Sequence, residues 1–403
     1  MIINKEDIKG EDRFSRFKLI QWWDQEKISG AKILVIGAGA LGNEIIKNLS
    51  LLGVGHIFIA DMDSIENSNL SRSILFRSAH NGKEKARVAA MSAQDIFPGL
   101  KTRWFCGNIL FDLGMGVYKW ADLVMAGLDN REARLHINRF CWKVNTIWID
   151  GAIEAINGVA RVFIPPYSAC YECTMNDNDW KELQSRRSCN LLTGEEMELG
   201  KVPTTPTISS IIAGVQCQEM LKILHGIDTC GGAGFVFNGM FLDSYIVNYP
   251  RKEDCLSHEV FDNIIEVNMG AKVTELREVL SFIKEKLGAE AVLELNNDIL
   301  TGFQCRGCGK TERILKSLGK ATLEESLCPD CNTYRTPELT HTIDGSEDFL
   351  EKTLFDIGVP LFDILTGRLG LNQIFFELSL DRHEVLGPLL QENLCNGVKY
   401  VRK

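Results

Sequence analysis

Paired cysteines mark the C-terminal third of the chain as a place for metal chemistry. The pairs are Cys305-x-x-Cys308 and Cys328-x-x-Cys331, and residues 309–327 separate them. Thiolates at this spacing are typical ligands of a tetrahedral Zn²⁺ in a zinc ribbon. The spacing therefore predicts a structural zinc within a ribbon at about residues 300–335. So short a module would depend on its metal, because it can bury little apolar core.

A glycine-rich loop near the N-terminus predicts a nucleotide site. Gly37-x-Gly39-x-x-Gly42 lies between a short apolar run, residues 31–36, and a helical pattern. Glycines in this setting let phosphate groups approach the backbone at the start of a helix. Asp61 ends the next apolar run, where a carboxylate meets ribose hydroxyls. These features fit NAD, FAD and ATP alike, so the nucleotide has to be identified from other residues.

Charged residues downstream of the loop favour a triphosphate with a metal ion. Arg72 follows Asp61, and Lys85 stands in the first turn of a predicted helix. A lysine there opposes the helix dipole, so it usually serves an anion. Asp129 and Asn130 follow an apolar run whose end should face the ligand crevice. A carboxylate among phosphate-binding cations is best explained as a Mg²⁺ ligand.

The apolar pattern predicts the elements that would position these residues. Strands are expected at 31–36, 57–60, 123–126, 147–149 and 158–165, and helices at 43–52, from 207 to Gly226, and at 274–287. Alternating strands and helices favour a Rossmann-like, doubly wound mixed α/β sheet for residues 1–260. We place a domain boundary near residue 260. A smaller α+β region with the zinc ribbon is expected over 261–403, with charged helical segments running to the C-terminus.

Composition excludes several classes of protein. The chain has 403 residues and a net charge of −10, without the basic stripe of a nucleic-acid-binding protein. No apolar run approaches the roughly 18 residues of a membrane span. The N-terminal residues are charged and lack a signal-peptide core, so we expect a cytoplasmic protein. In that compartment the 13 cysteines would be metal ligands or free thiols rather than disulfides.

The glycine loop belongs to a longer series of motifs. In chain order the series comprises Arg13-Phe14-Ser15-Arg16, the glycine loop, Asp61-Met62-Asp63, Ser68-Asn69-Leu70-Ser71-Arg72, Gly82-Lys83-Glu84-Lys85-Ala86, Asp129-Asn130, Cys170-Tyr171-Glu172-Cys173-Thr174 and Pro203-Thr204-Thr205-Pro206-Thr207. It resembles the adenylating domains of ubiquitin-activating enzymes and of their bacterial relatives in molybdopterin and thiamine synthesis, the E1-like superfamily. The resemblance covers roughly residues 11–260. Such ordered agreement is more specific than any single motif.

The resemblance implies an enzyme that uses ATP and Mg²⁺ to adenylate the C-terminal glycine carboxylate of a small ubiquitin-like protein. The implied nucleotide-binding residues are Gly37, Gly39, Ala40, Gly42, Asp61, Asp63, Asn69, Arg72, Lys85, Asp129 and Asn130. Asn69, Arg72 and Lys85 would contact phosphates, and Asp129 would hold Mg²⁺. Arg16 would reach the phosphates from the partner subunit of a homodimer. The chain departs from the family pattern at Ala40, where a glycine is common, and at Ser73, where a glutamine is usual.

The family pattern also implies a second zinc site. In the family another Cys-x-x-Cys completes the site that Cys170 and Cys173 begin, and this chain has Cys255-Leu256-Ser257-His258 near that place. We therefore expect a closed Cys₃His structural zinc formed by Cys170, Cys173, Cys255 and His258. The alternative is that the second pair of ligands comes from further downstream.

Cys189 is the candidate nucleophile. It lies in a polar stretch, about residues 174–202, where ubiquitin-activating enzymes with a short insert place their thioester-forming cysteine. Arg186 and Arg187 would favour its thiolate, which is the nucleophilic form. The resemblance thus implies transfer of the modifier to Cys189 and onward to an E2-like conjugating enzyme. The alternative is a plain surface cysteine.

Three other functions remain open. Adenylation could serve sulfur-carrier activation or peptide modification, without a thioester step. An NAD-dependent oxidoreductase shares the fold, but it leaves Arg72, Lys85 and Asp129 unexplained as a set. A non-catalytic zinc scaffold could also retain the nucleotide fold.

Overall fold

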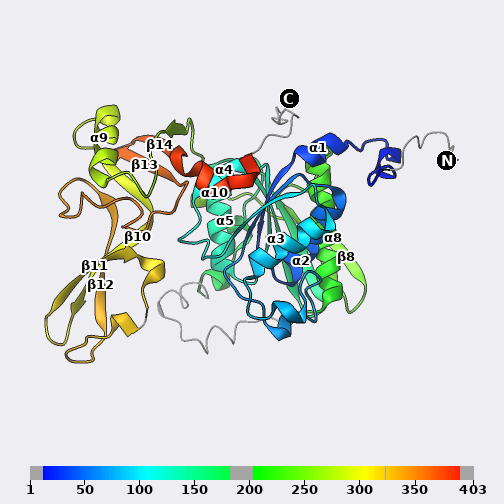
Figure 1. Ribbon diagram of the computed structural model, residues 1–403, viewed down its shortest axis with the longest axis horizontal. Helices are drawn as coiled ribbons and strands as arrows, with labels where there is room; N and C mark the ends of the chain where they lie inside the picture. Colours follow the sequence, from blue (N-terminus) through cyan, green and yellow to red (C-terminus); the bar gives the residue numbers. More distant parts are fainter. Residues whose placement is uncertain (1–11, 182–202, 323, 391–403) are drawn as a thin grey trace.

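The computed structural model describes residues 12–181, 203–322 and 324–390 (Figure 1). Within these ranges the chain forms an eight-stranded sheet from residues 32–248 and a six-stranded sheet from residues 265–378. The larger sheet lies at the centre of the molecule with helices on both faces, and the smaller sheet lies at one end. No helix in these ranges is both long and apolar enough to cross a membrane.

The larger sheet has the strand order β3-β2-β1-β4-β5-β6-β7-β8. Its strands are β1 (Lys32–Ile36), β2 (His56–Ala60), β3 (Lys101–Phe105), β4 (Leu123–Gly127), β5 (Ile147–Glu154), β6 (Asn157–Phe163), β7 (Ala233–Asn238) and β8 (Asp243–Asn248). Neighbours from β3 to β5 pair in parallel, and those from β5 to β8 pair antiparallel. The chain leaves β1 toward β2 and returns to β4 on the other side. Ligands bind at such a switch point, beyond the carboxyl ends of the strands.

Helices cover both faces of this sheet. They are α1 (Gln25–Gly30), α2 (Ala40–Leu52), α3 (Lys85–Ile96), α4 (Met115–Trp120), α5 (Arg131–Lys143) and α8 (Pro206–His225). In β1, Ile33 and Val35 face the core beneath α2, α3 and α8, while Leu34 and Ile36 face the core beneath α4 and α5. Burial on both faces explains why β1, β2 and β4 read as continuous apolar runs. The predicted mixed α/β sheet is confirmed.

The smaller sheet is built around one long strand. Its elements are β9 (Ile265–Val267), α9 (Leu276–Leu287), β10 (Val292–Cys305), β11 (Thr311–Ser317), β12 (Arg335–Ile343), β13 (Ile364–Leu369) and β14 (Asn372–Leu378), followed by α10 (Arg382–Leu386). The order is β11-β10-β13-β14-β9, and β12 also pairs with β10. Helix α9 packs on this sheet through Leu276, Val279, Leu280 and Ile283.

The expectation of charged helical segments toward the C-terminus was wrong for residues 335–378, and among the described residues only the short α10 fits it. The chain instead forms the antiparallel pair of β13 and β14, in which Leu369 lies opposite Asn372. Gly370 turns the chain with φ of +61°, a conformation that favours glycine. The missed signal was this glycine between two apolar runs, which is typical of a tight hairpin.

Backbone contacts join the two sheets at α4. The N–H of Gly116 donates to the carbonyl oxygen of Phe362 at 2.9 Å. The N–H of Met115 donates to Oδ1 of Asp363 at 2.8 Å, so a buried carboxylate of the C-terminal region caps this helix. A Cβ added at Gly116 would lie 2.4 Å from the Phe362 carbonyl oxygen. The close approach therefore requires glycine at position 116.

Candidate nucleotide and metal sites

The glycine loop packs against the backbone of neighbouring elements at the carboxyl ends of β1 and β4. Gly37 has φ of +91°, and a Cβ there would lie 2.6 Å from the carbonyl oxygen of Gly127. A Cβ on Gly42 would lie 1.8 Å from the carbonyl oxygen of Gly37. Helix α2 begins at Ala40, earlier than the sequence indicated, with Gly39 as its N-cap residue. Gly37 and Gly42 are thus required by close backbone contacts, and the start of α2 is left open to an anion.

Asp61 lies beside this loop, at the end of β2. Its Oδ2 accepts the N–H of Ala38 at 2.6 Å, and its Oδ1 accepts the N–H of Asp63 at 2.8 Å. Burial raises the pKa of Asp61 above its ordinary value, and the charge of Lys85 opposes this rise. Each carboxylate oxygen retains a second lone pair for a ligand hydroxyl. The position suits the ribose-binding role that the resemblance implies.

Lys85 is held at the same edge of the sheet by Asp63. Lys85 is the first residue of α3, as expected, and its Nζ lies 2.7 Å from Oδ2 of Asp63. Its own N–H donates to the carbonyl oxygen of Asp63 at 2.9 Å. The lysine side chain is only 11% exposed, while that of Asp63 is 60% exposed. Asp63 is therefore the partner of Lys85 in this structure.

Arg72 and Asn69 belong to one turn that follows β2. The Nη1 of Arg72 donates to the carbonyl oxygen of Ser68 at 2.8 Å. Oδ1 of Asn69 accepts the N–H of Glu66 at 3.0 Å, so this side chain shapes the turn. This contact uses one of the five N–H groups of the guanidinium, so Arg72 can bind a phosphate without losing it.

Asp129 and Asn130 follow β4 and differ in their surroundings. Asp129 is exposed beyond the carboxyl end of the strand. Oδ1 of Asn130 accepts the N–H groups of Glu132 at 2.8 Å and Ala133 at 3.4 Å, which caps α5. Asp129 is thus available to a cation, whereas the side-chain oxygen of Asn130 already serves the helix.

Arg16 lies apart from these residues within its own chain. It adjoins Phe14, whose ring contacts Gly53 at the C-terminal end of α2 and Phe97 at the C-terminal end of α3. The glycine loop is at the opposite end of α2, and a helix of 13 residues is about 20 Å long. The structure therefore does not place Arg16 in the nucleotide site of the same chain.

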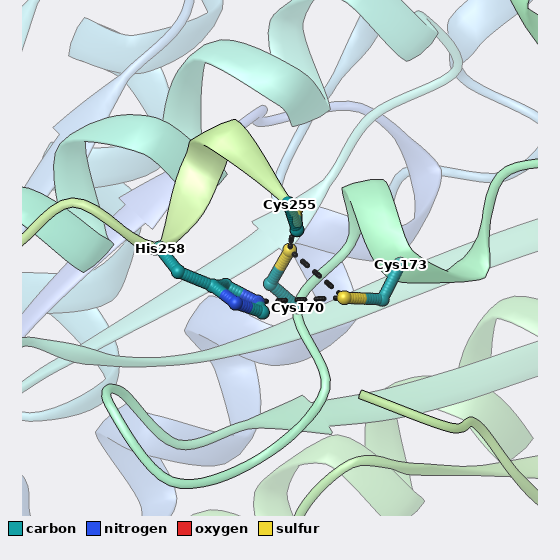
Figure 2. Close-up of side chains that lie close together, drawn as sticks. All are labelled: Cys170, Cys173, Cys255 and His258. Carbon is teal, nitrogen blue, oxygen red and sulfur yellow. Dashed lines mark hydrogen bonds between the residues drawn. The ribbon is translucent and has the colours of Figure 1, made fainter. Parts of the chain in front are cut away.

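Figure 2 shows Cys170, Cys173, Cys255 and His258 pointing toward one another. Sγ of Cys170 lies 3.7 Å from Sγ of Cys173 and 3.5 Å from Sγ of Cys255. Nε2 of His258 lies 3.4 Å from Sγ of Cys173. Around a tetrahedral zinc with bonds of about 2.3 Å, sulfur atoms are about 3.8 Å apart. The ligand set and spacing fit Zn²⁺, and they favour these partners over a pair from further downstream.

Two turns of the chain build this cluster. Cys170 precedes a 3₁₀ turn, Glu172–Thr174, and Cys173 lies within it. Cys255 precedes a second 3₁₀ turn, Leu256–His258, which ends at the histidine. Hydrogen bonds from the Cys170 thiol and from the N–H of Lys252 help lower the pKa of Cys173 to about 4, while the same contact raises the pKa of Cys170 above its ordinary value. A low thiol pKa favours the thiolate, which is the metal-binding form.

The C-terminal cysteines form another cluster among the described residues. Sγ of Cys305 lies 3.4 Å from Sγ of Cys331, and Sγ of Cys308 lies 3.7 Å from Sγ of Cys328. In each loop a backbone N–H returns to the first cysteine: Gly309 donates to the Cys305 carbonyl, and Asn332 to the Cys328 carbonyl, both at 2.9 Å. Matching loops with four convergent sulfur atoms fit the predicted zinc ribbon.

Sequence reasoning missed a buried ion cluster beside Asp129. Asp150 is fully buried, with Arg134 at 2.9 Å and Arg161 at 2.5 Å. Burial opposes its charge, but the two guanidinium groups outweigh burial and lower the pKa of Asp150. Arg134 also donates to the carbonyl oxygen of Leu128, so it holds the turn that carries Asp129. The available signal was an acid ending an apolar strand, as in Asp61.

The candidate nucleophile cannot be placed. Cys189, with Arg186 and Arg187, lies in residues 182–202, outside the described residues. Just before this stretch in the chain, Asp179 pairs with Arg131 of α5. Just after this stretch, the carbonyl oxygen of Pro203 accepts the N–H of Ala155 at 2.7 Å. The thioester role of Cys189 therefore stays a prediction.

A doubly wound sheet with a glycine loop and an acidic residue at the switch point defines a nucleotide-binding protein of the Rossmann-like class. Residues 12–256 match the ThiF family, and the chain belongs to this family. The predicted membership of the E1-like superfamily is thereby confirmed.

Curated relatives include activating enzymes of ubiquitin-like proteins. The chain is 40% identical over 184 residues to the NEDD8-activating enzyme E1 catalytic subunit of Caenorhabditis elegans, which covers 41% of this chain and 42% of that protein. It is 38% identical over 149 residues to SUMO-activating enzyme subunit 2 of Dictyostelium discoideum, covering 37% of this chain and 22% of that protein. The chain thus spans less than half the length of these relatives.

A solved structure supports the fold. Escherichia coli MccB with ATP matches with a TM-score of 0.53 at 20% identity, over 64% of this chain and 77% of that chain. At this level of identity the match supports the architecture alone.

Proposed function

We propose that this chain is an E1-like activating enzyme that uses ATP and Mg²⁺ to adenylate the C-terminal glycine carboxylate of a small ubiquitin-like protein. The observation that carries the proposal is the arrangement at one edge of the sheet. The glycine loop, Asp61, Lys85 and Asp129 all follow the carboxyl ends of β1, β2 and β4. Family membership and the relatives named above support the same reaction.

The chemistry explains why cations are needed. A free carboxylate is a poor acyl donor, because its leaving group would be oxide. In the proposed step a carboxylate oxygen attacks the α-phosphorus of ATP, the bond to the β-phosphate breaks, and pyrophosphate leaves with the negative charge. Lys85 and Arg72 would stabilise that charge, and Asp129 would hold Mg²⁺, which supplies further positive charge when bound. The ammonium group of Lys85 has three N–H donors, so it can bind a phosphate oxygen in addition to Asp63 or in its place.

A thioester step would follow on Cys189. Its thiolate attacks the carbonyl carbon of the acyl adenylate, the bond to the phosphate oxygen breaks, and AMP leaves. The modifier would then pass to an E2-like conjugating enzyme. The relatives named as NEDD8- and SUMO-activating enzymes support the activation of a ubiquitin-like modifier. Without Cys189 the same adenylation would serve sulfur-carrier activation or peptide modification.

The proposal also covers the oligomeric state, the cellular location and the bound metal ions. We place a homodimer in the cytoplasm, in which Arg16 of one subunit serves the nucleotide site of the other. The distance of about 20 Å between the two ends of α2 supports action in trans. Both cysteine clusters would hold structural Zn²⁺, because their ligand sets are closed and their spacings fit tetrahedral coordination.

ATP–pyrophosphate exchange with a candidate modifier tests the adenylation step. We expect exchange in the wild type and its loss in Asp129→Ala, with Asp95→Ala on the exposed end of α3 as the matched control. Retained exchange in folded Asp129→Ala would refute the role of Asp129. A thiol-sensitive adduct that persists in Cys189→Ala would refute the thioester assignment while leaving adenylation intact.

A further inference from the structure

Asn43 is a fully buried polar residue in the first turns of α2. Its Nδ2 donates to the carbonyl oxygens of Ala38 at 2.6 Å and Gly39 at 3.1 Å. Its Oδ1 accepts the N–H of Leu75 at 2.8 Å. One side chain therefore joins the glycine loop to the segment that follows Arg72.

The two carbonyl contacts orient the loop. In a trans peptide the C=O of one residue and the N–H of the next point in opposite directions. Because Asn43 holds the carbonyl oxygens of Ala38 and Gly39 inward, the N–H groups of Gly39 and Ala40 point away from Asn43. These groups stand at the open start of α2, where backbone N–H groups and the helix dipole attract a phosphate.

The Leu75 contact fixes a different part of the site. The carbonyl oxygen of Leu75 accepts the hydroxyl of Ser92 in α3 at 2.9 Å. Leu75 is thus tied to α2 through its N–H and to α3 through its C=O. Arg72 is three positions earlier, and its N–H bonds back to the Asn69 carbonyl at 3.1 Å. Asn43 therefore sets where the turn with Arg72 sits relative to the glycine loop.

Apolar packing alone does not explain this residue. Asn43 lies between Leu41 and Ile45, which are buried in the core beneath α2. A buried amide costs free energy unless its groups are hydrogen-bonded, and an apolar side chain would avoid that cost. All three partners of Asn43 belong to segments that carry nucleotide-site residues.

We propose that Asn43 is a positioning residue of the nucleotide site, which aims the N–H groups of Gly39 and Ala40 at the phosphates and sets the place of Arg72. The inference rests on the proposed use of ATP. It adds a residue that acts through the backbone and through Arg72 without touching the ligand itself.

Direct binding of ATP–Mg²⁺ to the full chain tests this role without a modifier. Asn43→Leu, which is close in volume, should raise the Kd for ATP at least tenfold. Asn43→Asp keeps an acceptor for Leu75 but places a negative charge against two carbonyl oxygens, so it should weaken binding further. If neither of these variants folds, Asn43→Ser can be used instead, because its smaller polar side chain fits the same buried position. Ser50→Ala is the matched control, because Ser50 is buried at the far end of α2 and bonds only within the helix.

A double-mutant cycle separates positioning from general stability. If Asn43 acts partly through Arg72, Asn43→Leu and Arg72→Ala together should weaken ATP binding by less than the product of their single effects. A Kd within twofold of the wild type in folded Asn43→Leu, or in Asn43→Ser if Leu does not fold, would overturn the inference. The inference would also be overturned if Asn43→Leu raised the Kd for ATP no more than Ser50→Ala does when both variants lose the same Tm. A wild type that does not bind ATP would instead refute the proposed function.

Discussion

Lys85 and Asp63 form an ion pair of 2.7 Å in which the lysine is nearly buried and the acid is largely exposed. The pair stands at the carboxyl end of β2, beside Asp61. Asp63 therefore holds Lys85 at this edge of the sheet, and it also competes with a phosphate for the same ammonium group. Whether Asp63 is a ligand of the nucleotide or a counter-ion of Lys85 can be decided by experiment.

Asp63→Asn should strengthen the binding of ATP by a few-fold, because it removes a negative charge near the phosphates. An exposed ion pair contributes roughly 0.2–1 kcal/mol, and tenfold in affinity corresponds to about 1.4 kcal/mol. Lys85→Met should weaken binding instead. Equilibrium binding of ATP at several salt concentrations checks both variants. Weaker binding in Asp63→Asn would show that Asp63 contacts the nucleotide, as the family resemblance implied.

The two cysteine clusters should bind metal independently. The described wild-type chain offers two complete ligand sets, so elemental analysis should give two zinc ions per chain. Cys170→Ser and Cys305→Ser should each retain one, because the clusters share no ligand. Each variant should also lose stability, since the binding free energy of a structural zinc contributes to folding. One variant that loses both ions would contradict separate sites.

The pH dependence of stability should report on Asp363 at the junction of the two sheets. Burial raises the pKa of Asp363 to about 6, against hydrogen bonds from the N–H of Met115 and from Asn296. The folded state therefore favours the protonated acid. The free-energy cost of burying an ionised Asp363 is absent below about pH 4, where the acid is protonated in both states. This cost grows as pH rises and reaches its full value above about pH 6.

Relative to Asp363→Asn, the wild type should lose on the order of 2–3 kcal/mol of unfolding free energy between pH 4 and pH 6. Urea denaturation of both proteins across this range measures the difference. Asp344 offers a contrast, because hydrogen bonds with Ser346 lower its pKa, so its contribution to stability is lost only as pH falls below about 4. Between pH 4 and pH 6, Asp344→Asn should therefore change the slope very little. A constant difference between wild type and Asp363→Asn would contradict the raised pKa.

The sequence predicted the features that depend on neighbouring residues, namely most of the buried strands and the C-terminal cysteine cluster. Continuous apolar runs predicted β1, β2, β4 and β5, because both faces of these strands are largely buried. They did not predict β3, whose sequence at the edge of the sheet is polar and only partly buried. The Cys305–Cys331 ribbon followed from spacing. The position of His258 beside Cys173 required the family pattern, since the chain between them folds into α8, β7 and β8.

The parts that could not be predicted depend on long-range contacts. Asn43 stands in an apolar helix, and its partner Leu75 is separated from it by β2. Asp150 is surrounded by apolar residues in sequence, and only the fold brings Arg134 and Arg161 to it. The location of Phe14, and hence of Arg16, depends on packing against the ends of α2 and α3.

Gly116→Ala should loosen the junction between the two sheets. A Cβ there would meet the Phe362 carbonyl oxygen at 2.4 Å, and backbone on both sides would have to move. Overpacking of this kind costs roughly 1–3 kcal/mol. We expect faster hydrogen exchange at the N–H of Gly116 and faster proteolysis near residue 260, without loss of either metal.

Gly214→Ala provides the matched control for that substitution. Gly214 lies inside α8, and a Cβ there meets nothing within 4 Å. Alanine is favoured over glycine by about 1 kcal/mol in a helix interior, so this variant should be as stable as the wild type or more stable. If Gly116→Ala proves equally harmless, the backbone contact between α4 and Phe362 does not hold the C-terminal sheet against the nucleotide-binding sheet.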